Sequence, residues 1–97
     1  MDALKAAPES ATLIMENERV RVLDVKFKPG QKTIMHSHPD HVVYVIKDGK
    51  FKITLPDGTS NEVNLKAGQA IWMKAGQHAV ENLRKTEANN LIIELKK

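Results

Sequence analysis

The chain has 97 residues and a mass of 10.9 kDa, which is the size of a single domain with one small core. It has no cysteine, so disulfides and thiolate metal sites are excluded, and any bound metal must use nitrogen and oxygen ligands. The net charge is +3, but the 15 basic residues are scattered among 12 acidic ones, and the aromatic residues are one Trp, one Tyr and two Phe. We therefore expect no nucleic-acid partner, because the chain offers neither a basic patch nor a set of stacking rings.

Residues 1–16 are expected to form an N-terminal arm, followed by a single domain over residues 17–97. The arm carries Asp2, Lys5 and Pro8 among short apolar residues. It therefore has neither the continuous hydrophobic region of a signal peptide nor a membrane span. These features predict a cytoplasmic protein with no membrane partner.

From residue 20 onward the sequence alternates between apolar and polar residues, with short breaks. Leu23, Val25 and Phe27 share one face of the first expected strand, which ends at a Pro-Gly pair. The expected strands cover residues 20–27, 33–38, 42–47, 50–55, 61–65, 69–74, 78–83 and 91–95. Asp48-Gly49, between two of them, is typical of a two-residue type I′ hairpin turn. No helical pattern separates these strands, so we predict an all-β sandwich or barrel of about eight short antiparallel strands.

His36 and His38 are two positions apart on an expected strand, so both imidazoles should lie on the same face. His78 lies on a later strand that can return beside the first in an antiparallel fold. Three neutral imidazoles on one cavity wall suit a divalent first-row transition metal. We therefore expect one such ion per chain, with iron as the leading choice and nickel, copper, manganese and zinc as alternatives.

Glycines and histidines recur at fixed spacings in two segments. The first segment has Gly30, five further residues, His36-x-His38 and then Gly49, and the second has Gly68, five further residues, Lys74-x-Gly76, His78 and Asn82. This arrangement resembles the paired motifs of the cupin superfamily and spans residues 30–82. The resemblance implies a double-stranded β-helix, or jelly roll, with a metal at the barrel centre held by side chains of both motifs.

The chain departs from the cupin pattern in three respects. Val42 stands where many cupins have a glutamate ligand, Lys74 replaces the usual proline, and a single residue separates the last glycine of the second motif from its histidine. Some cupin dioxygenases use three histidines without the glutamate. The resemblance therefore still implies a metal site made of three histidines.

His41 is a candidate fourth ligand. On a regular strand its side chain would lie on the face opposite to Val42, and a bulge near Pro39-Asp40 would be needed to turn it towards the metal. The alternative is an exposed loop histidine. The sequence leaves both interpretations open.

Strand parity also indicates which residues line the metal cavity. Ile34 has the parity of His36 and His38, and Val80 has that of His78, so the expected pocket consists of Ile34, Val42, Tyr44, Val80 and Asn82. Asn82 can orient a ligand or make a hydrogen bond at the end of its strand. The directions of Trp72 and Arg21 stay open, since Arg21 has the parity of the barrel face but can also be a surface arginine.

A metal with open coordination positions in a mainly apolar cavity favours oxygenase chemistry. We expect dioxygenase action on a small organic substrate whose oxygens chelate the metal. The alternative is a non-catalytic module that binds a small molecule or a metal, so the partner is a small molecule in both cases. A small sandwich also exposes sheet edges and apolar outer residues that pairing can cover, and we expect a homodimer.

Overall fold

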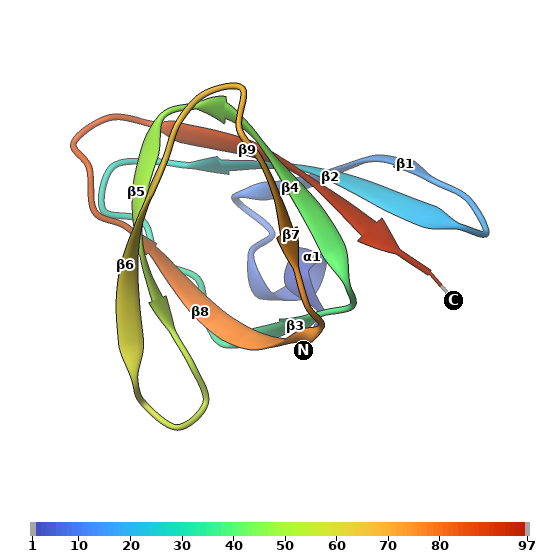
Figure 1. Cartoon of the computed structure of the whole chain (residues 1–97), viewed down its shortest axis with the longest axis horizontal. Helices are drawn as coiled ribbons and strands as arrows, with labels where there is room; N and C mark the ends of the chain where they lie inside the picture. The colour runs from blue at the N-terminus through green and yellow to red at the C-terminus, as the bar shows by residue number, and fades with distance from the viewer. Residues whose placement is uncertain (1, 97) are drawn as a thin grey trace.

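The computed structural model describes residues 2–96, which fold into two β-sheets that face each other (Figure 1). The five-stranded sheet has the order β1 (Ala11–Glu16), β2 (Val20–Phe27), β9 (Ala88–Leu95), β4 (His41–Lys47) and β7 (Ala70–Met73). The four-stranded sheet has the order β3 (His36–His38), β8 (Gly76–Asn82), β5 (Gly49–Thr54) and β6 (Ser60–Leu65). Neighbouring strands pair antiparallel. The predicted all-β fold is confirmed, and the strands within residues 2–96 number nine because β1 adds to the expected set.

The N-terminal segment, expected to be an arm, contains two regular elements. Asp2 caps the short helix α1 (Ala3–Ala6) by accepting a hydrogen bond from a backbone amide of its first turn, and β1 pairs with β2 as an edge strand. No helix within residues 2–96 is long and apolar enough to cross a membrane. The sequence did not indicate β1 because its apolar residues do not alternate with polar ones but follow one another at the exposed positions Leu13, Ile14 and Met15.

Asp48 and Gly49 do not form the predicted type I′ hairpin turn. β4 and β5 belong to different sheets, so the chain crosses between layers here, and neither residue has a positive φ. Gly49 is required for space, because a Cβ at this position would lie 2.6 Å from the ring of Phe51. Asp48 anchors the crossing by accepting a hydrogen bond from the backbone amide of Ala67 at 2.7 Å.

The core lies between the two sheets and is built from residues that alternate along the strands. Leu23, Val25 and Phe27 of β2 are buried, as the alternation predicts. From the opposite sheet, Phe51 packs its ring against Phe27 edge to face, with centroids 5.4 Å apart. These contacts join the sheets beside the cavity described below.

Strand β4 presents the opposite face to the barrel from the one predicted. His41, Val43 and Val45 are buried, whereas Tyr44 is 42% exposed. Because β4 is apolar on both faces, its period-two pattern alone cannot tell which face is inside. The prediction that Val42 and Tyr44 face the barrel was therefore wrong.

Candidate metal centre

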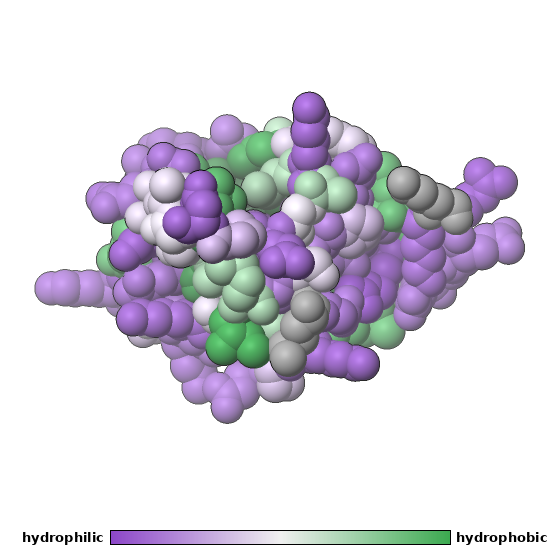
Figure 2. Space-filling model, turned by 90° about the horizontal axis from the view of Figure 1, so that it is seen from below, coloured by the Kyte–Doolittle hydropathy of each residue, from purple (hydrophilic) through white to green (hydrophobic). Residues whose placement is uncertain are grey.

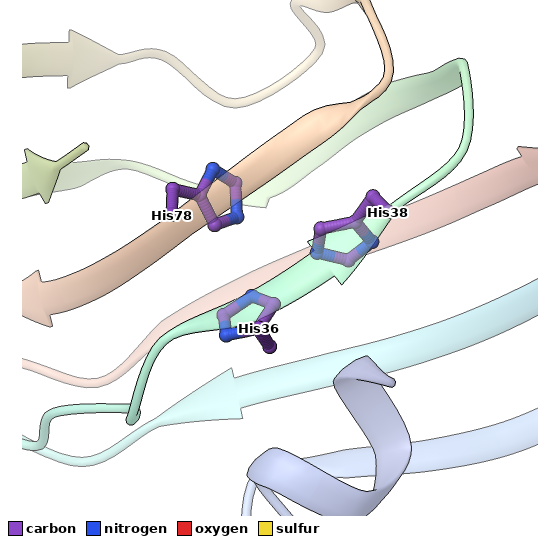
Figure 3. Close-up of side chains that lie close together, drawn as sticks. All are labelled: His36, His38 and His78. Atoms are coloured by element: carbon purple, nitrogen blue, oxygen red, sulfur yellow. The ribbon is translucent and has the colours of Figure 1, made fainter. Parts of the chain in front are cut away.

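Three histidines from two neighbouring strands converge inside the barrel (Figure 3). His36 pairs directly with His78 across β3 and β8, and His38 lies two residues further along β3 on the same face. A ring nitrogen of each lies within 4.8 Å of those of the other two. The ring centroids are 4.9 Å apart for His36 and His38, 4.7 Å for His36 and His78, and 5.1 Å for His38 and His78. The strand spacing thus places three imidazoles where one ion can contact all of them.

Hydrogen bonds determine which nitrogen of His36 and His38 is available to a metal. Nδ1 of His36 donates to the carbonyl oxygen of Ile34 at 2.8 Å, and Nδ1 of His38 donates to the carboxylate of Glu94 at 2.6 Å. Carbonyl and carboxylate oxygens can only accept, so Nδ1 carries the proton in both rings. In the neutral ring Nε2 then has a free lone pair, which is the form in which imidazole binds a metal.

The carboxylate that holds His38 belongs to a chain of charged groups that runs from the buried Glu94 to the partly exposed Asp2. The Glu94 side chain is 3% exposed, and it also accepts a hydrogen bond from Nε of Arg21 at 2.8 Å. The Arg21 guanidinium in turn pairs with the carboxylate of Asp2 at 2.5 Å. Arg21 therefore faces inward, and the two carboxylates leave one negative charge in excess beside His38.

Glu94 stays ionised in this setting. Burial alone would raise its pKa, but hydrogen bonds from His38 and Arg21 outweigh burial and lower the pKa of Glu94 below its ordinary value. A negative carboxylate behind an imidazole strengthens the imidazole as a ligand and attracts a cation to the site.

His41 is buried next to this cluster and is not the exposed loop residue that one interpretation of the sequence gave. Its exposed fraction is 2%, and its ring lies 4.6 Å from that of His38, centroid to centroid. Its Nδ1 donates to the carbonyl oxygen of Pro39 at 2.8 Å, so its Nε2 is also unprotonated. His41 lines the cavity but does not belong to the group of three whose nitrogens lie mutually close.

Burial keeps the imidazoles of His36, His41 and His78 neutral at neutral pH. It lowers the pKa values of His36 and His41 below the ordinary value. For His78, burial and the neighbouring imidazoles together lower the pKa from 6.5 to about 3. Neutral nitrogen donors at neutral pH are what a divalent metal requires.

An apolar cavity of about 360 Å³ opens beside the histidines. Its wall combines aliphatic and aromatic side chains from both sheets with three alanines of the N-terminal segment, Ala3, Ala7 and Ala11. The apolar residues include Val25, Phe27, Phe51, Ile53, Val80 and Ile92. Such a wall excludes water and suits a mainly hydrophobic ligand.

Of the predicted pocket residues, Val80 lines this cavity and the others lie elsewhere. Ile34 precedes the start of β3, so strand parity does not extend to it, and it is 56% exposed. Val42 and Tyr44 lie on the outer face of the five-stranded sheet, where Val42 pairs with Trp72 and with a residue of β9. Trp72 is 53% exposed.

Asn82 is fully buried, but it serves the fold and not the cavity. Its side-chain nitrogen donates to the carbonyl oxygens of Phe27, Lys28 and Thr86 at 3.3, 3.1 and 3.0 Å. Its side-chain oxygen accepts from the backbone amide of Arg84 at 3.0 Å. Asn82 therefore ties the ends of β2 and β8 together, as the alternative role at a strand end predicted.

Two charged residues of the site were not predicted. Glu94 lies on the same face of the last strand as Ile92. A charged side chain on an apolar strand face needs a buried partner, so this position could have indicated that Glu94 belongs to the site. Asp2 gave no signal, because its position depends on how the N-terminal segment returns to form a bridge with Ser37 of β3.

Comparison with known proteins agrees with this fold. A family model for the cupin domain matches residues 23–94. The "Beta-alanine degradation protein BauB" of Pseudomonas aeruginosa is 38% identical over 73 residues, which cover 73% of this chain and 76% of that protein. The crystal structure of a cupin domain from Bordetella pertussis Tohama I is 34% identical and superposes with a TM-score of 0.84 over 90% of this chain and 92% of that chain.

A more distant likeness supports the fold alone. A cupin with a double-stranded β-helix fold from Methanocaldococcus jannaschii is 17% identical, with a TM-score of 0.69 over 89% of this chain and 78% of that chain. The matched region of the family model contains both histidine motifs and most strands of the two sheets. The chain belongs to the cupin family.

Proposed function

We propose that His36, His38 and His78 bind one divalent transition metal, iron in the first place, and that the protein is an oxygenase for a small chelating organic compound. The observation that supports this most is the donor set: three mutually close imidazoles, two with Nδ1 protonated towards a fixed acceptor, at the side of an apolar cavity. Nitrogen donors of this kind fit iron, nickel, copper, manganese or zinc, and facial sets with open positions are typical of non-haem iron oxygenases.

The residues around the site would have different roles in such a reaction. A bound metal would supply Lewis acidity and redox chemistry at positions left open by the three histidines. Glu94 holds the His38 ring in one orientation, and the apolar wall keeps bulk water from the substrate. Val42 replaces the usual glutamate and points outward, and the inward-facing side chain at this part of β4 is His41. We propose that His41 contacts the substrate or a water molecule and is not a fourth ligand.

The relative from Pseudomonas aeruginosa is named for β-alanine degradation. β-Alanine is a zwitterion, and both of its charges would need partners in a dry site. The described residues that line the cavity are mostly apolar, and Lys74 is the cationic side chain among them. We therefore propose a less polar substrate for this chain.

A non-catalytic binding module is the second candidate function. It uses the same cavity and the same metal but requires no turnover. The two candidates differ in one measurable property, the consumption of dioxygen, which decides between them.

We also propose that the protein forms a homodimer through the outer face of its five-stranded sheet. The strand registers align one apolar residue from each strand in a continuous row: Met15, Val22, Ile93, Val42 and Trp72. A second row places Leu91 beside Tyr44 and Ala70. The side seen from below, where β3 and β8 lie, is instead largely hydrophilic with small hydrophobic patches (Figure 2). In a two-fold dimer the same patch of both subunits is buried, so a second copy is the proposed partner of this apolar face.

Metal content should depend on the three clustered histidines. Protein purified without an affinity tag should bind about one divalent ion per chain, and His36→Ala, His38→Ala and His78→Ala should each reduce this to near zero under the same conditions. Elemental analysis after dialysis measures the ratio. Glu94→Gln should keep the ion but weaken its binding about ten- to hundredfold, because that substitution removes the charge behind His38.

The matched control for these variants is His41→Gln, which removes a buried imidazole of the same cavity. It should leave about one ion per chain. Loss of the ion in His41→Gln, or full retention of the ion in the three alanine variants, contradicts the proposed ligand set.

The stability of the metal-free protein should fall as the pH is lowered from 7 to 5. The folded-state pKa of His78 is about 3, against 6.5 in the unfolded chain. Between these values the unfolded chain holds a proton that the folded chain does not, so acid favours unfolding. Each such histidine contributes up to about 1.4 kcal/mol per pH unit to the slope. Urea unfolding in the presence of a chelator measures the free energy of unfolding at each pH. This free energy should depend less steeply on pH in His78→Gln than in the wild type. Equal slopes in the two proteins would show that His78 does not cause the pH dependence.

Oxygenase activity should appear with a simple chelating compound. Iron(II)-loaded protein under nitrogen should develop a new visible absorption band when a small β-diketone such as acetylacetone is added, and admission of air should then cause dioxygen uptake. The His38→Ala variant is the control for iron in solution. A band without dioxygen uptake supports the binding module, and absence of both disproves an open metal site.

Self-association should depend on the outer sheet face. Sedimentation velocity should give twice the chain mass of 10.9 kDa. Tyr44→Asp should shift the protein to the monomer, because a carboxylate would be buried without a partner in the interface. Leu55→Asp is the matched control, since Leu55 is 39% exposed outside this face, and it should remain a dimer. A dimeric Tyr44→Asp variant excludes this interface.

A further inference from the structure

Asn90 carries a buried polar group that the fold does not use. It lies on β9, is 7% exposed and lines the cavity. Among the buried side-chain oxygen and nitrogen atoms of residues 2–96, its Oδ1 is the one without a hydrogen-bond partner. Buried polar groups are normally satisfied, so an exception calls for a ligand or another explanation.

The other buried asparagines show the usual situation. Asn82 makes four hydrogen bonds to the backbone. Asn89, the neighbour of Asn90 in the chain, donates to the carboxylate of Asp24 at 2.6 Å and to the carbonyl oxygen of Val25 at 3.1 Å. The side chain of Asn90 alone among the three points into the cavity, so its lack of a partner is a property of the cavity wall.

The strand neighbours of Asn90 offer no polar side chain to a trapped water molecule. A buried water needs two to four polar partners. The residues paired with Asn90 on the neighbouring strands are Val25 and Val45, and both are buried and apolar. A water at this place would therefore receive no side-chain hydrogen bond from either neighbour, and a ligand group is the alternative partner.

Asn90 lies away from the metal cluster along the same strand. Asn90, Ile92 and Glu94 have the same parity on β9, and Glu94 marks the metal end because it binds His38. Four residues of strand separate the backbones of Asn90 and Glu94 by roughly 13 Å. Ile92 lies between them and is apolar. The cavity thus has polar groups near two ends and a hydrophobic wall between.

We propose that Asn90 binds a hydrogen-bond donor, a hydroxyl or N–H group, at the far end of an elongated ligand. The middle of this ligand is apolar, and its other end carries a chelating oxygen group. The chelating end rests on the proposed function, whereas the contact with Asn90 does not. Asn90 is then a specificity-determining residue, because an apolar ligand end would leave its amide oxygen unpaired.

The stability of the metal-free protein tests the absence of an internal partner. Asn90→Leu replaces an unsatisfied amide by an apolar group of similar size, so it should leave the melting temperature unchanged or raise it. Asn82→Leu makes the same replacement where four hydrogen bonds are lost, and it should lower the melting temperature by several degrees or prevent folding. A loss in Asn90→Leu as large as in Asn82→Leu would show that Asn90 has a structural partner, including a bound water, and would overturn the proposal.

Ligand selectivity tests the donor contact. The probes are hexanohydroxamic acid and 6-hydroxyhexanohydroxamic acid, which differ only by a terminal hydroxyl, and binding to the zinc-loaded protein is measured by calorimetry. The wild type should prefer the hydroxylated probe by about tenfold, as one buried hydrogen bond provides. Asn90→Leu should abolish or reverse this preference.

The same titrations, repeated with the metal-free protein, separate this proposal from the proposed function. Equal affinities of the two probes for the wild type, with binding that requires zinc, would overturn the role of Asn90 and leave the metal site standing. A preference for the hydroxylated probe that disappears in Asn90→Leu, with binding that does not require zinc, would support Asn90 and contradict the metal site.

Discussion

The hydrogen bond between Glu94 and His38 is the interaction on which the rest of this structure depends. It joins β9, the middle strand of the five-stranded sheet, to β3, an edge strand of the other sheet, inside the barrel. Through Arg21 the same carboxylate is connected to Asp2, which also caps helix α1. A buried carboxylate is costly unless it is paired, so this network ties the N-terminal segment, both sheets and the histidine cluster into one arrangement.

This network also accounts for the division of the barrel interior. Charged groups gather behind His38, where each has a partner, and the cavity in front of the histidines is almost wholly apolar. The hydrogen bonds from Nδ1 of His36 and His38 hold these rings in one orientation and leave Nε2 as the nitrogen available to a metal. A ligand that enters therefore meets the histidine nitrogens at one end and hydrophobic walls elsewhere, with Asn90 as the exception.

The sequence predicts those parts that depend on regular local geometry. His36 and His38 share a face because the strand period is two, and this held once β3 formed. The same rule failed at Ile34, which lies before the strand, and on β4, where both faces are apolar and His41 turned out to face inward. The hairpin predicted at Asp48-Gly49 was wrong because a turn dipeptide indicates only which φ angles its residues prefer. It does not indicate which sheet the next strand joins. Contacts such as those of Asp2 depend on the whole topology, which no local pattern contains.

Nitrogen-15 NMR of the imidazole rings in the metal-free protein at pH 7 tests the central claim most directly. Each histidine ring reports whether it is charged and which nitrogen carries the proton. The structure predicts a proton on Nδ1 for His36, His38 and His41, with neutral rings for His36 and His41, and Glu94→Gln should change the signals of His38 most. A proton on Nε2 of His38, or a charged His36, would contradict a preorganised donor set and with it the account of the site.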